Sequence, residues 1–269
     1  MDLSIVILDY KSRGLVRQCV KTLKLFAPAQ KTEIIVVDNA SGQGTGGMIR
    51  REYPDVVMID NPANVGFAAG NNAGIRRSTG KYVLIMNPDI TVRPGAIEAM
   101  IAHMEANPEI GLLGPRLVHP DGSIDVSCYR YPTPMIPAYR RTPLGRLPAG
   151  RKALSYYLMD DFDHGQSRDV DWLLGAVLLV RRSAMDKVGL LDERYFLYFE
   201  DTDWCRRFWQ AGFRVVFFAG AEMVHYHERL SAQGSWVTGL FRKATRIHIA
   251  SCVKYFKKWG LPEAAKDRV

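Results

Sequence analysis

The first hundred residues alternate between short apolar runs and stretches with helical spacing. The apolar runs, rich in Ile and Val as expected for strands buried on both faces, are residues 3–9, 33–38, 56–60 and 81–86. Helical spacing begins near Gly14, after Gly66 towards Ser78, and over residues 94–106, where Pro94 suits a first helical turn. This alternation predicts an α/β fold with a mostly parallel sheet and helices on both faces.

The second half of the chain is less regular. Residues 110–128 predict a hairpin around the turn sequence His119-Pro120-Asp121-Gly122, and the proline-rich, basic residues 129–152 predict a mobile loop. A helix is expected from about Asp201 to Gly212, because a glycine is a natural helix stop. The basic, aromatic-rich residues 236–259 predict a further helix.

These elements suggest a main domain over residues 1–230, with a nucleotide-binding half (1–106) and an acceptor or catalytic half (107–230). A basic amphipathic helical extension is expected over residues 231–269. The net charge of +8, from 36 Lys and Arg against 28 Asp and Glu, suits an anionic partner. Charge alone does not choose among nucleotide, lipid phosphate and nucleic acid, and no nucleic-acid-binding motif accompanies it.

The cysteines and the start of the chain point to the cytoplasm. The four cysteines, none of them in Cys-x-x-Cys spacing, are expected to be reduced thiols. Residues 3–8 are apolar from the outset, with no basic region before them, and predict a strand in place of a signal peptide. No apolar run reaches the roughly 18–20 residues that span a bilayer. We therefore expect a cytoplasmic protein, at most peripheral on the membrane.

Polar residues follow each of the four apolar runs. They are Asp9-Tyr10, Asp38-Asn39-Ala40-Ser41, Asn61 to Gly70, and Asn87-Pro88-Asp89. In open α/β sheets, ligands bind beyond the carboxyl ends of the strands. One such residue could simply cap a helix or form a turn, but four strand ends supplying Asp and Asn predict a binding site.

A stretch of small residues, Asn64 to Gly74, begins the second predicted helix. Such a segment lets backbone N–H groups approach a phosphate or sugar. The dinucleotide fingerprint is absent after the first strand, and so is a P-loop.

Carboxylates gather in Glu200-Asp201-Thr202-Asp203, behind an aromatic run. At a helix start they benefit from the helix dipole, and one of them can also serve as a general base. His225-Tyr226-His227 follows a later apolar stretch. The spacing around it does not favour a dedicated zinc site, and a histidine that completes a carboxylate-bound Mg²⁺ or Mn²⁺ fits better.

Together these segments resemble the inverting family 2 glycosyltransferases of the GT-A fold, especially the bacterial rhamnosyltransferase-like branch. The resemblance covers nearly all of residues 3–259. It is carried by the segments at residues 4–10, 34–41, 64–67, 87–89, 189–193 and 200–204, and by His225.

The resemblance implies roles by position. Asp38 would accept the N3–H of a uracil or thymine base, Asp201 would be the catalytic base, and Glu200 would help to orient the acceptor. Asp89 and His225 would hold Mg²⁺ or Mn²⁺ on the donor diphosphate. The candidate nucleotide and donor residues are Asp9, Tyr10, Asp38, Asn64, Gly66, Phe67, Asn71, Asn72, Asn87 and Asp89. Trp172, Gly175 and Ala176 would line the acceptor side.

The sequence departs from the branch at two places: Asn87-Pro88-Asp89 stands for an Asp-x-Asp metal motif, and Asp9 stands where the branch usually has Asn. The implied activity is transfer of a hexose, rhamnose from dTDP-rhamnose by first preference and a UDP-hexose by second, onto a glycan or lipid-linked acceptor at an anionic membrane. The alternatives are a sugar-nucleotide nucleotidyltransferase and a non-catalytic sugar-nucleotide-binding module.

Overall fold

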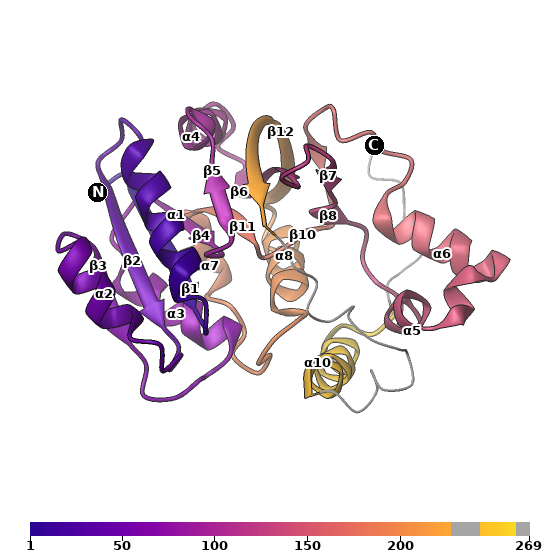
Figure 1. The fold of residues 1–269 in the computed structure, drawn as a ribbon. Coiled ribbons are helices and arrows are strands. Elements are labelled where there is room, and N and C mark those ends of the chain that lie inside the picture. Colours follow the sequence, from indigo (N-terminus) through magenta and orange to yellow (C-terminus); the bar gives the residue numbers. More distant parts are fainter. Residues whose placement is uncertain (227–242, 262–269) are drawn as a thin grey trace.

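The computed structural model describes residues 1–226 and 243–261, and a ten-stranded sheet runs through the first of these ranges (Figure 1). Its strand order is β3-β2-β1-β4-β11-β6-β12-β5, with β7 beside β6 and β9 beside β12. The strands on this path are β1 (Leu3–Asp9), β2 (Thr32–Asp38), β3 (Val57–Asp60), β4 (Tyr82–Met86), β5 (Ile90–Val92), β6 (Ile110–Val118), β11 (Val177–Arg181) and β12 (Arg214–His225). The short strands are β7 (Ile124–Asp125), β9 (Arg168–Asp169), and the separate pair β8 (Cys128–Tyr129) and β10 (Trp172–Leu173).

Four adjacent strands of the sheet are parallel, and the rest of the sheet is mixed. β3, β2, β1 and β4 are parallel neighbours, and β6 is parallel to β12. β11 is antiparallel to both β4 and β6, and β5 is antiparallel to β12. Because β11 runs the other way, its first residue, Val177, pairs with the last residue of β4, Met86. The segment before β11 therefore reaches the same edge as the ends of β1, β2 and β4.

Helices cover both faces of the sheet, as the alternating pattern predicted. On one face pack α1 (Arg13–Leu25), α2 (Thr45–Glu52) and α4 (Ala96–Ala106), in one hydrophobic cluster with Leu3, Ile5 and Ile7 of β1. On the other face pack α3 (Phe67–Arg77), α7 (Arg182–Val188) and α8 (Glu200–Gln210), in a second cluster with Val6 and Leu8 of β1. The period of two along β1 thus divides the core between the two layers.

Three expectations from the sequence need correction. Residues 129–152 are not a loop throughout: they contain α5 (Ile136–Arg141), the 3-10 helix η1 (Pro143–Arg146) and the start of α6 (Pro148–Leu158). Prolines begin α6 and η1, where a missing N–H costs nothing, so they start helices here. Pro94 was expected in the first turn of a helix over residues 94–106, but it lies before α4, whose N-cap is Gly95. Helix α2 was not expected, because its glycines hide the apolar pattern.

The last described helix, α10 (Lys243–Trp259), packs on α8 through a buried carboxylate. Asp203 has no exposed surface, and it accepts from Arg207 Nε (2.9 Å), Trp259 Nε1 (2.8 Å) and Lys258 Nζ (2.6 Å). Tyr255 of α10 is also fully buried. The predicted extension over residues 231–269 is thus joined to the main domain where it is described, and its remaining residues, with His227, lie outside the described ranges.

Candidate active site

The carboxylate of Asp9, at the end of β1, is fully engaged inside the fold. Its Oδ1 accepts from the backbone N–H (2.9 Å) and hydroxyl (2.7 Å) of Ser12, and its Oδ2 accepts from the Thr45 hydroxyl (2.5 Å). Asp9 has no exposed surface. These bonds connect β1 to the starts of α1 and α2. A contact between Asp9 and a nucleotide stays a prediction, and the bonds that occupy both carboxylate oxygens do not favour it.

A network of amides joins the ends of β2 and β3. Asn39 is buried; its Nδ2 donates to Asn64 Oδ1 (2.9 Å) and its Oδ1 accepts from Asn61 Nδ2 (3.1 Å). Asp38 beside it accepts from Ser41 N–H at 2.7 Å. Tyr10 is half exposed, and a hydrogen bond with Asn64 lowers the pKa of its hydroxyl. Tyr10, Asp38 and Asn64 therefore share one rim, and Asn39, which sequence reasoning did not single out, holds it together.

The glycine-rich segment contacts the second half of the chain directly. Gly66 has a φ of +89°, and a Cβ there would lie 2.3 Å from the carbonyl oxygen of Phe196. Phe67 N–H donates to that same oxygen at 2.7 Å. Only glycine fits this close approach of two backbones. The segment thus positions the chain that leads to Glu200 and Asp201.

Asn71 and Asn72, one turn into α3, are buried. Asn72 Nδ2 donates to the Leu191 carbonyl (2.8 Å), and Asn72 Oδ1 accepts from Leu191 N–H (3.1 Å). Asn71 Nδ2 donates to the Phe67 carbonyl at 3.0 Å. These bonds give Asn72 a bridging function between α3 and the Gly189–Glu193 segment.

Glu200 and Asp201 begin α8, and both are buried. Asp201 Oδ2 accepts from Gly175 N–H (3.0 Å), and its Oδ1 accepts from Thr202 N–H (2.7 Å). A Cβ on Gly175 would lie 3.4 Å from both Asp201 Oδ2 and the Phe67 ring. The predicted base, acceptor-side glycine and donor-side phenylalanine therefore meet at one point.

The two carboxyls at this point differ in how their charge is stabilised. Burial raises the pKa of Asp201, while its bonds from Gly175 and Thr202 act against that rise. Burial and the charge of Asp201 raise the pKa of Glu200 well above its ordinary value, and Glu200 Oε2 has no hydrogen-bond partner within the described residues. Asp201 is therefore the member of the pair that ionises first, and Glu200 keeps its proton longer.

Ala176 connects this point to the end of β4. Its carbonyl accepts from Asn87 N–H at 2.8 Å, and Asp89 follows two residues later. Trp172 lies further from the carboxylates: its ring stacks on Tyr129 with 4.4 Å between centroids, and its Nε1 donates to the Arg130 carbonyl at 3.0 Å. Trp172 thus supports the wall behind Gly175 and Ala176.

Asp89 and His225 lie next to each other because β5 pairs with β12, where His225 is opposite Ile90. His225 Nε2 is 3.4 Å from Asp89 Oδ2, and its Nδ1 is 2.7 Å from Asp125 Oδ2. Burial by itself lowers the pKa of His225, but the hydrogen bonds with Asp125 and Asp89 outweigh it and raise this pKa to about 9. Sequence reasoning missed Asp125, which lies on the return strand of the predicted hairpin.

These residues fit a divalent cation of the Mg²⁺ or Mn²⁺ type. Asp89 Oδ1 is buried and has no hydrogen-bond partner in residues 1–226 and 243–261. A carboxylate oxygen and an imidazole nitrogen suit Mn²⁺, and a carboxylate on the other ring nitrogen is the usual support of a metal-binding histidine. The described residues contain no group of three or more metal-binding side chains, so donor phosphates and water would complete the coordination.

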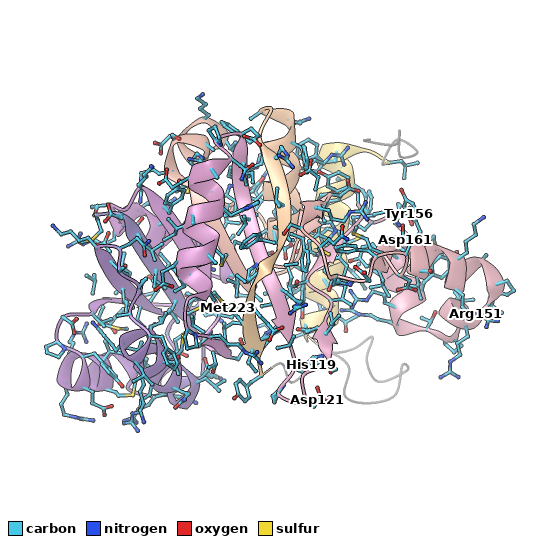
Figure 2. All side chains as sticks on the ribbon, turned by 90° about the horizontal axis from the view of Figure 1, so that it is seen from above. His119, Asp121, Arg151, Tyr156, Asp161 and Met223 are labelled. Atoms are coloured by element: carbon cyan, nitrogen blue, oxygen red, sulfur yellow. The ribbon has the colours of Figure 1, made fainter. Side chains whose placement is uncertain are left out.

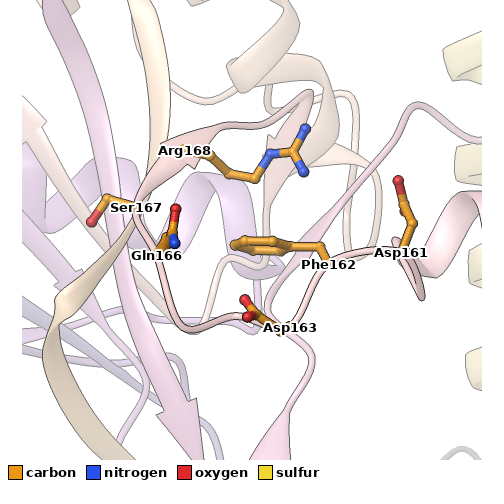
Figure 3. A pocket seen from close by; sticks show the side chains of 6 residues that line it. All are labelled: Asp161, Phe162, Asp163, Gln166, Ser167 and Arg168. Atoms are coloured by element: carbon orange, nitrogen blue, oxygen red, sulfur yellow. The ribbon is translucent and has the colours of Figure 1, made fainter.

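A surface hollow of about 410 Å³ is lined by a different set of residues (Figure 3). Asp161, Phe162, Asp163, Gln166, Ser167 and Arg168 line it, and the Arg168 guanidinium lies 5.0 Å from the Phe162 ring centre. None of the predicted site residues lines it, so the strand ends remain the candidate active site.

Solved structures share this arrangement of sheet and helices. A mannosyltransferase from Pyrobaculum calidifontis, in complex with GDP-Man and Mn²⁺, matches with a TM-score of 0.59 and 16% identity over 86% of this chain and 58% of that one. GalNAc-T7 with UDP, GalNAc and Mn²⁺ matches with a TM-score of 0.65 and 14% identity over 89% of this chain and 47% of that one. The fold is therefore that of the GT-A glycosyltransferases, as expected from the sequence.

Sequence comparison identifies the family. Residues 4–148 match the model of glycosyl transferase family 2. An N-acetylglucosaminyl-diphospho-decaprenol L-rhamnosyltransferase of Mycobacterium tuberculosis is 32% identical over 74% of this chain and 68% of its own length. The low-salt glycan biosynthesis hexosyltransferase Agl10 of Haloferax volcanii is 29% identical over 77% of this chain and 61% of its own length. This chain belongs to glycosyltransferase family 2, and it resembles the rhamnosyltransferase branch of that family.

Proposed function

We propose that the protein transfers a hexose, with inversion, from a nucleoside-diphosphate sugar to an acceptor hydroxyl, and that Asp201 is the base. One observation carries the proposal: a continuous set of contacts joins Asp201 through Gly175 and Ala176 to Asn87, two residues before Asp89. The base and the candidate diphosphate site are thereby held on one short path along the edge of the sheet.

In the proposed reaction, the acceptor O–H gives its proton to the Asp201 carboxylate while its oxygen attacks the anomeric carbon. The bond from that carbon to the diphosphate oxygen breaks, and the electron pair leaves with the diphosphate. Asp89 and His225 would hold a divalent cation, which when bound would supply Lewis-acid stabilisation to the leaving diphosphate. Attack opposite to the leaving group inverts the anomeric centre in one displacement. Asp38 and Asn64, at the ends of β2 and β3, would bind the nucleoside.

For the donor we propose dTDP-rhamnose, and the identity with the mycobacterial rhamnosyltransferase supports this choice. UDP-hexoses are the second candidate. A donor screen tests both: the protein is incubated with dTDP-, UDP- and GDP-sugars and Mn²⁺, and nucleoside diphosphate release is measured with and without an acceptor. Release from dTDP-rhamnose is expected to be fastest. Release of pyrophosphate from a nucleoside triphosphate and a sugar phosphate would instead indicate a nucleotidyltransferase.

The acceptor that we propose is a lipid-linked, diphosphate-bearing glycan, as in the name of the mycobacterial relative. Contact with an anionic membrane goes with it, because the outer side of α10 exposes Arg246, Ile249, Val253 and Lys257. Each cation near an anionic surface contributes about 1 kcal/mol. No helix within residues 1–226 and 243–261 has the length and apolar character of a membrane span.

Vesicle co-sedimentation tests the membrane contact. Wild type is expected to sediment with phosphatidylglycerol vesicles at low salt and less at high salt. Reversing charge at Arg246 and Lys257 should reduce sedimentation, whereas reversal at Lys21 of α1 and Lys31 before β2, which are also exposed, should not. No sedimentation of wild type at low salt would leave α10 a structural helix.

A further inference from the structure

Two adjacent arginines at the end of α5, Arg140 and Arg141, have no function in the site described above. Arg140 is exposed and Arg141 is half-buried. Among the described residues, no carboxylate forms an ion pair with either guanidinium. Arg130, by contrast, is held by both oxygens of Asp161, at 3.0 and 2.7 Å. The pair on α5 thus concentrates positive charge without a counter-charge from the described chain.

Two tyrosines are near these arginines, and one of them, Tyr157, packs against Trp172 with 6.3 Å between ring centres. The Arg140 guanidinium lies 5.9 Å from the ring centre of Tyr157. Burial raises the pKa of Tyr157 to about 12, the charge of Arg140 opposes this rise, and that of Asp201 adds to it. Burial likewise raises the pKa of Tyr198, Arg141 opposes the rise, and Glu200 adds to it. Each tyrosine is therefore within electrostatic reach of both a guanidinium of the pair and a catalytic carboxyl.

The Arg141 guanidinium is partly removed from water, and the charges of the pair act on each other and on a neighbouring histidine. Burial lowers the pKa of Arg141, and the charge of Arg140 acts in the same direction. His248 of α10 contacts the Tyr198 ring with 4.7 Å between centroids. Burial, together with the charges of Arg141 and Arg140, lowers the pKa of His248 to about 3, so this histidine is neutral at pH 7. Two guanidinium groups in such a place match a phosphate or diphosphate, which they can bind through several charged hydrogen bonds.

The place of α5 favours the acceptor over the donor as the source of this anion. Figure 1 shows α5 and α6 at the end of the molecule opposite to β3 and α2. The donor nucleotide is assigned to the ends of β1, β2 and β3, and its diphosphate to Asp89 and His225. A diphosphate at α5 therefore belongs to a second substrate that reaches Asp201 from the other side.

We propose that Arg140 and Arg141 bind the diphosphate of a lipid-linked acceptor while the acceptor sugar hydroxyl faces Asp201. This assignment rests on the proposed function, and it names the group by which the acceptor is recognised.

Binding of farnesyl diphosphate in detergent micelles, measured by calorimetry with EDTA present, tests the assignment without any transfer reaction. EDTA removes divalent cations, which disables the Asp89 and His225 site as a competing binder. The double variant R140A/R141A should bind about ten- to a hundred-fold more weakly, because each charged hydrogen bond lost corresponds to about one factor of ten or more. R151A is the matched control: Arg151 is exposed in the first turn of α6, Figure 2 shows it at the outer edge of the molecule, and this variant should bind as wild type does.

Every outcome decides the assignment. Equal affinity of wild type and R140A/R141A, or no binding by wild type, would overturn it. Phosphatidylglycerol vesicles separate the two sources of phosphate: the double variant should still sediment with them, and loss of sedimentation with unchanged farnesyl diphosphate binding would assign the arginines to membrane headgroups. If wild type released no nucleotide in the donor screen, the proposed transfer would fail, and farnesyl diphosphate binding would still decide for or against the anion site.

Discussion

Replacement of Asp201 by Asn tests the assignment of the base most directly. The carboxylate accepts one N–H bond on each oxygen, from Gly175 (3.0 Å) and Thr202 (2.7 Å). An Asn side chain keeps one acceptor oxygen and turns an NH₂ group towards the other donor. The lost bond to a charged group costs about 1.5–3 kcal/mol, and the relief of a buried charge offsets part of this cost. We expect the variant to fold. Each kcal/mol of lost stability lowers the melting temperature by about 2–4 °C, so the melting temperature should fall by only a few degrees.

The expected effect on catalysis is much larger. Loss of a general base lowers the rate by about 10²–10⁴, which is about 3–5 kcal/mol in transition-state free energy. Donor affinity should stay nearly unchanged, because the residues proposed to bind the nucleoside, Asp38 and Asn64, lie at the end of β2 and after β3, whereas Asp201 is in α8. Glu200→Gln is the matched comparison. Since burial and the charge of Asp201 raise the pKa of Glu200 and so favour its neutral form, which Gln reproduces, we expect a loss below about ten-fold, or 1.4 kcal/mol.

The assay measures single-turnover transfer at saturating donor, and titration with the nucleoside diphosphate measures donor affinity. The rate of wild type should rise with pH as Asp201 ionises, with its midpoint above the ordinary aspartate pKa, because burial raises the pKa of this carboxyl. Wild-type transfer by D201N would refute the assignment. A larger loss in E200Q than in D201N would refute the proposed division of protonation between the two carboxyls.

Four further outcomes are expected. Asp89→Asn should weaken metal-dependent donor binding, and chelator should abolish transfer; full activity in excess EDTA would contradict the cation site. Asp125→Asn should weaken Mn²⁺ affinity by about 10–100-fold, as loss of a carboxylate behind a metal-binding histidine does, measured by the spin-resonance signal of free Mn²⁺ with nucleotide present. Gly66→Ala should destabilise the protein through the clash with Phe196, whereas Gly47→Ala, with open space around it, should not; denaturant midpoints compare them. Asp203→Asn should lower the unfolding free energy by about 3–5 kcal/mol, because it leaves Arg207 and Lys258 without their buried partner; an unchanged midpoint would contradict this.

Local pattern was sufficient for the first four strands. The four predicted strands match β1 to β4 within one residue at each end, because each is a short apolar run. β1, β2 and β4 are mostly buried, whereas β3, at the edge of the sheet, is only partly buried. The turn at residues 119–122 also formed as expected, with Gly122 N–H donating to the His119 carbonyl at 2.9 Å. These features depend on residues that are close together in the sequence, so a single sequence is enough to predict them.

The rest depended on contacts that sequence does not display. Pro143 and Pro148 looked like loop residues, and their position at helix starts follows from how α5, η1 and α6 pack on one another. Asp125 carries no sign of its function until β12 brings His225 to within 2.7 Å of it, 100 residues away in the chain. Asp9 shows the reverse case: its place after β1 suggested a ligand contact, and its bonds to Ser12 and Thr45 give it a structural function.

The position of the base is set from the donor half of the molecule. Tyr198 and Phe199, immediately before Glu200, have φ values of +71° and +70°, which aromatic residues adopt only at a cost of about 1–3 kcal/mol each. Such a conformation persists where its surroundings enforce it. Here α3 holds the preceding segment at two places: Phe67 bonds to Phe196, and Asn72 bonds to Leu191. Helix α3, which begins in the glycine-rich segment, thereby fixes the turn that presents Asp201. The segment thus has a structural function in addition to its predicted contact with the donor.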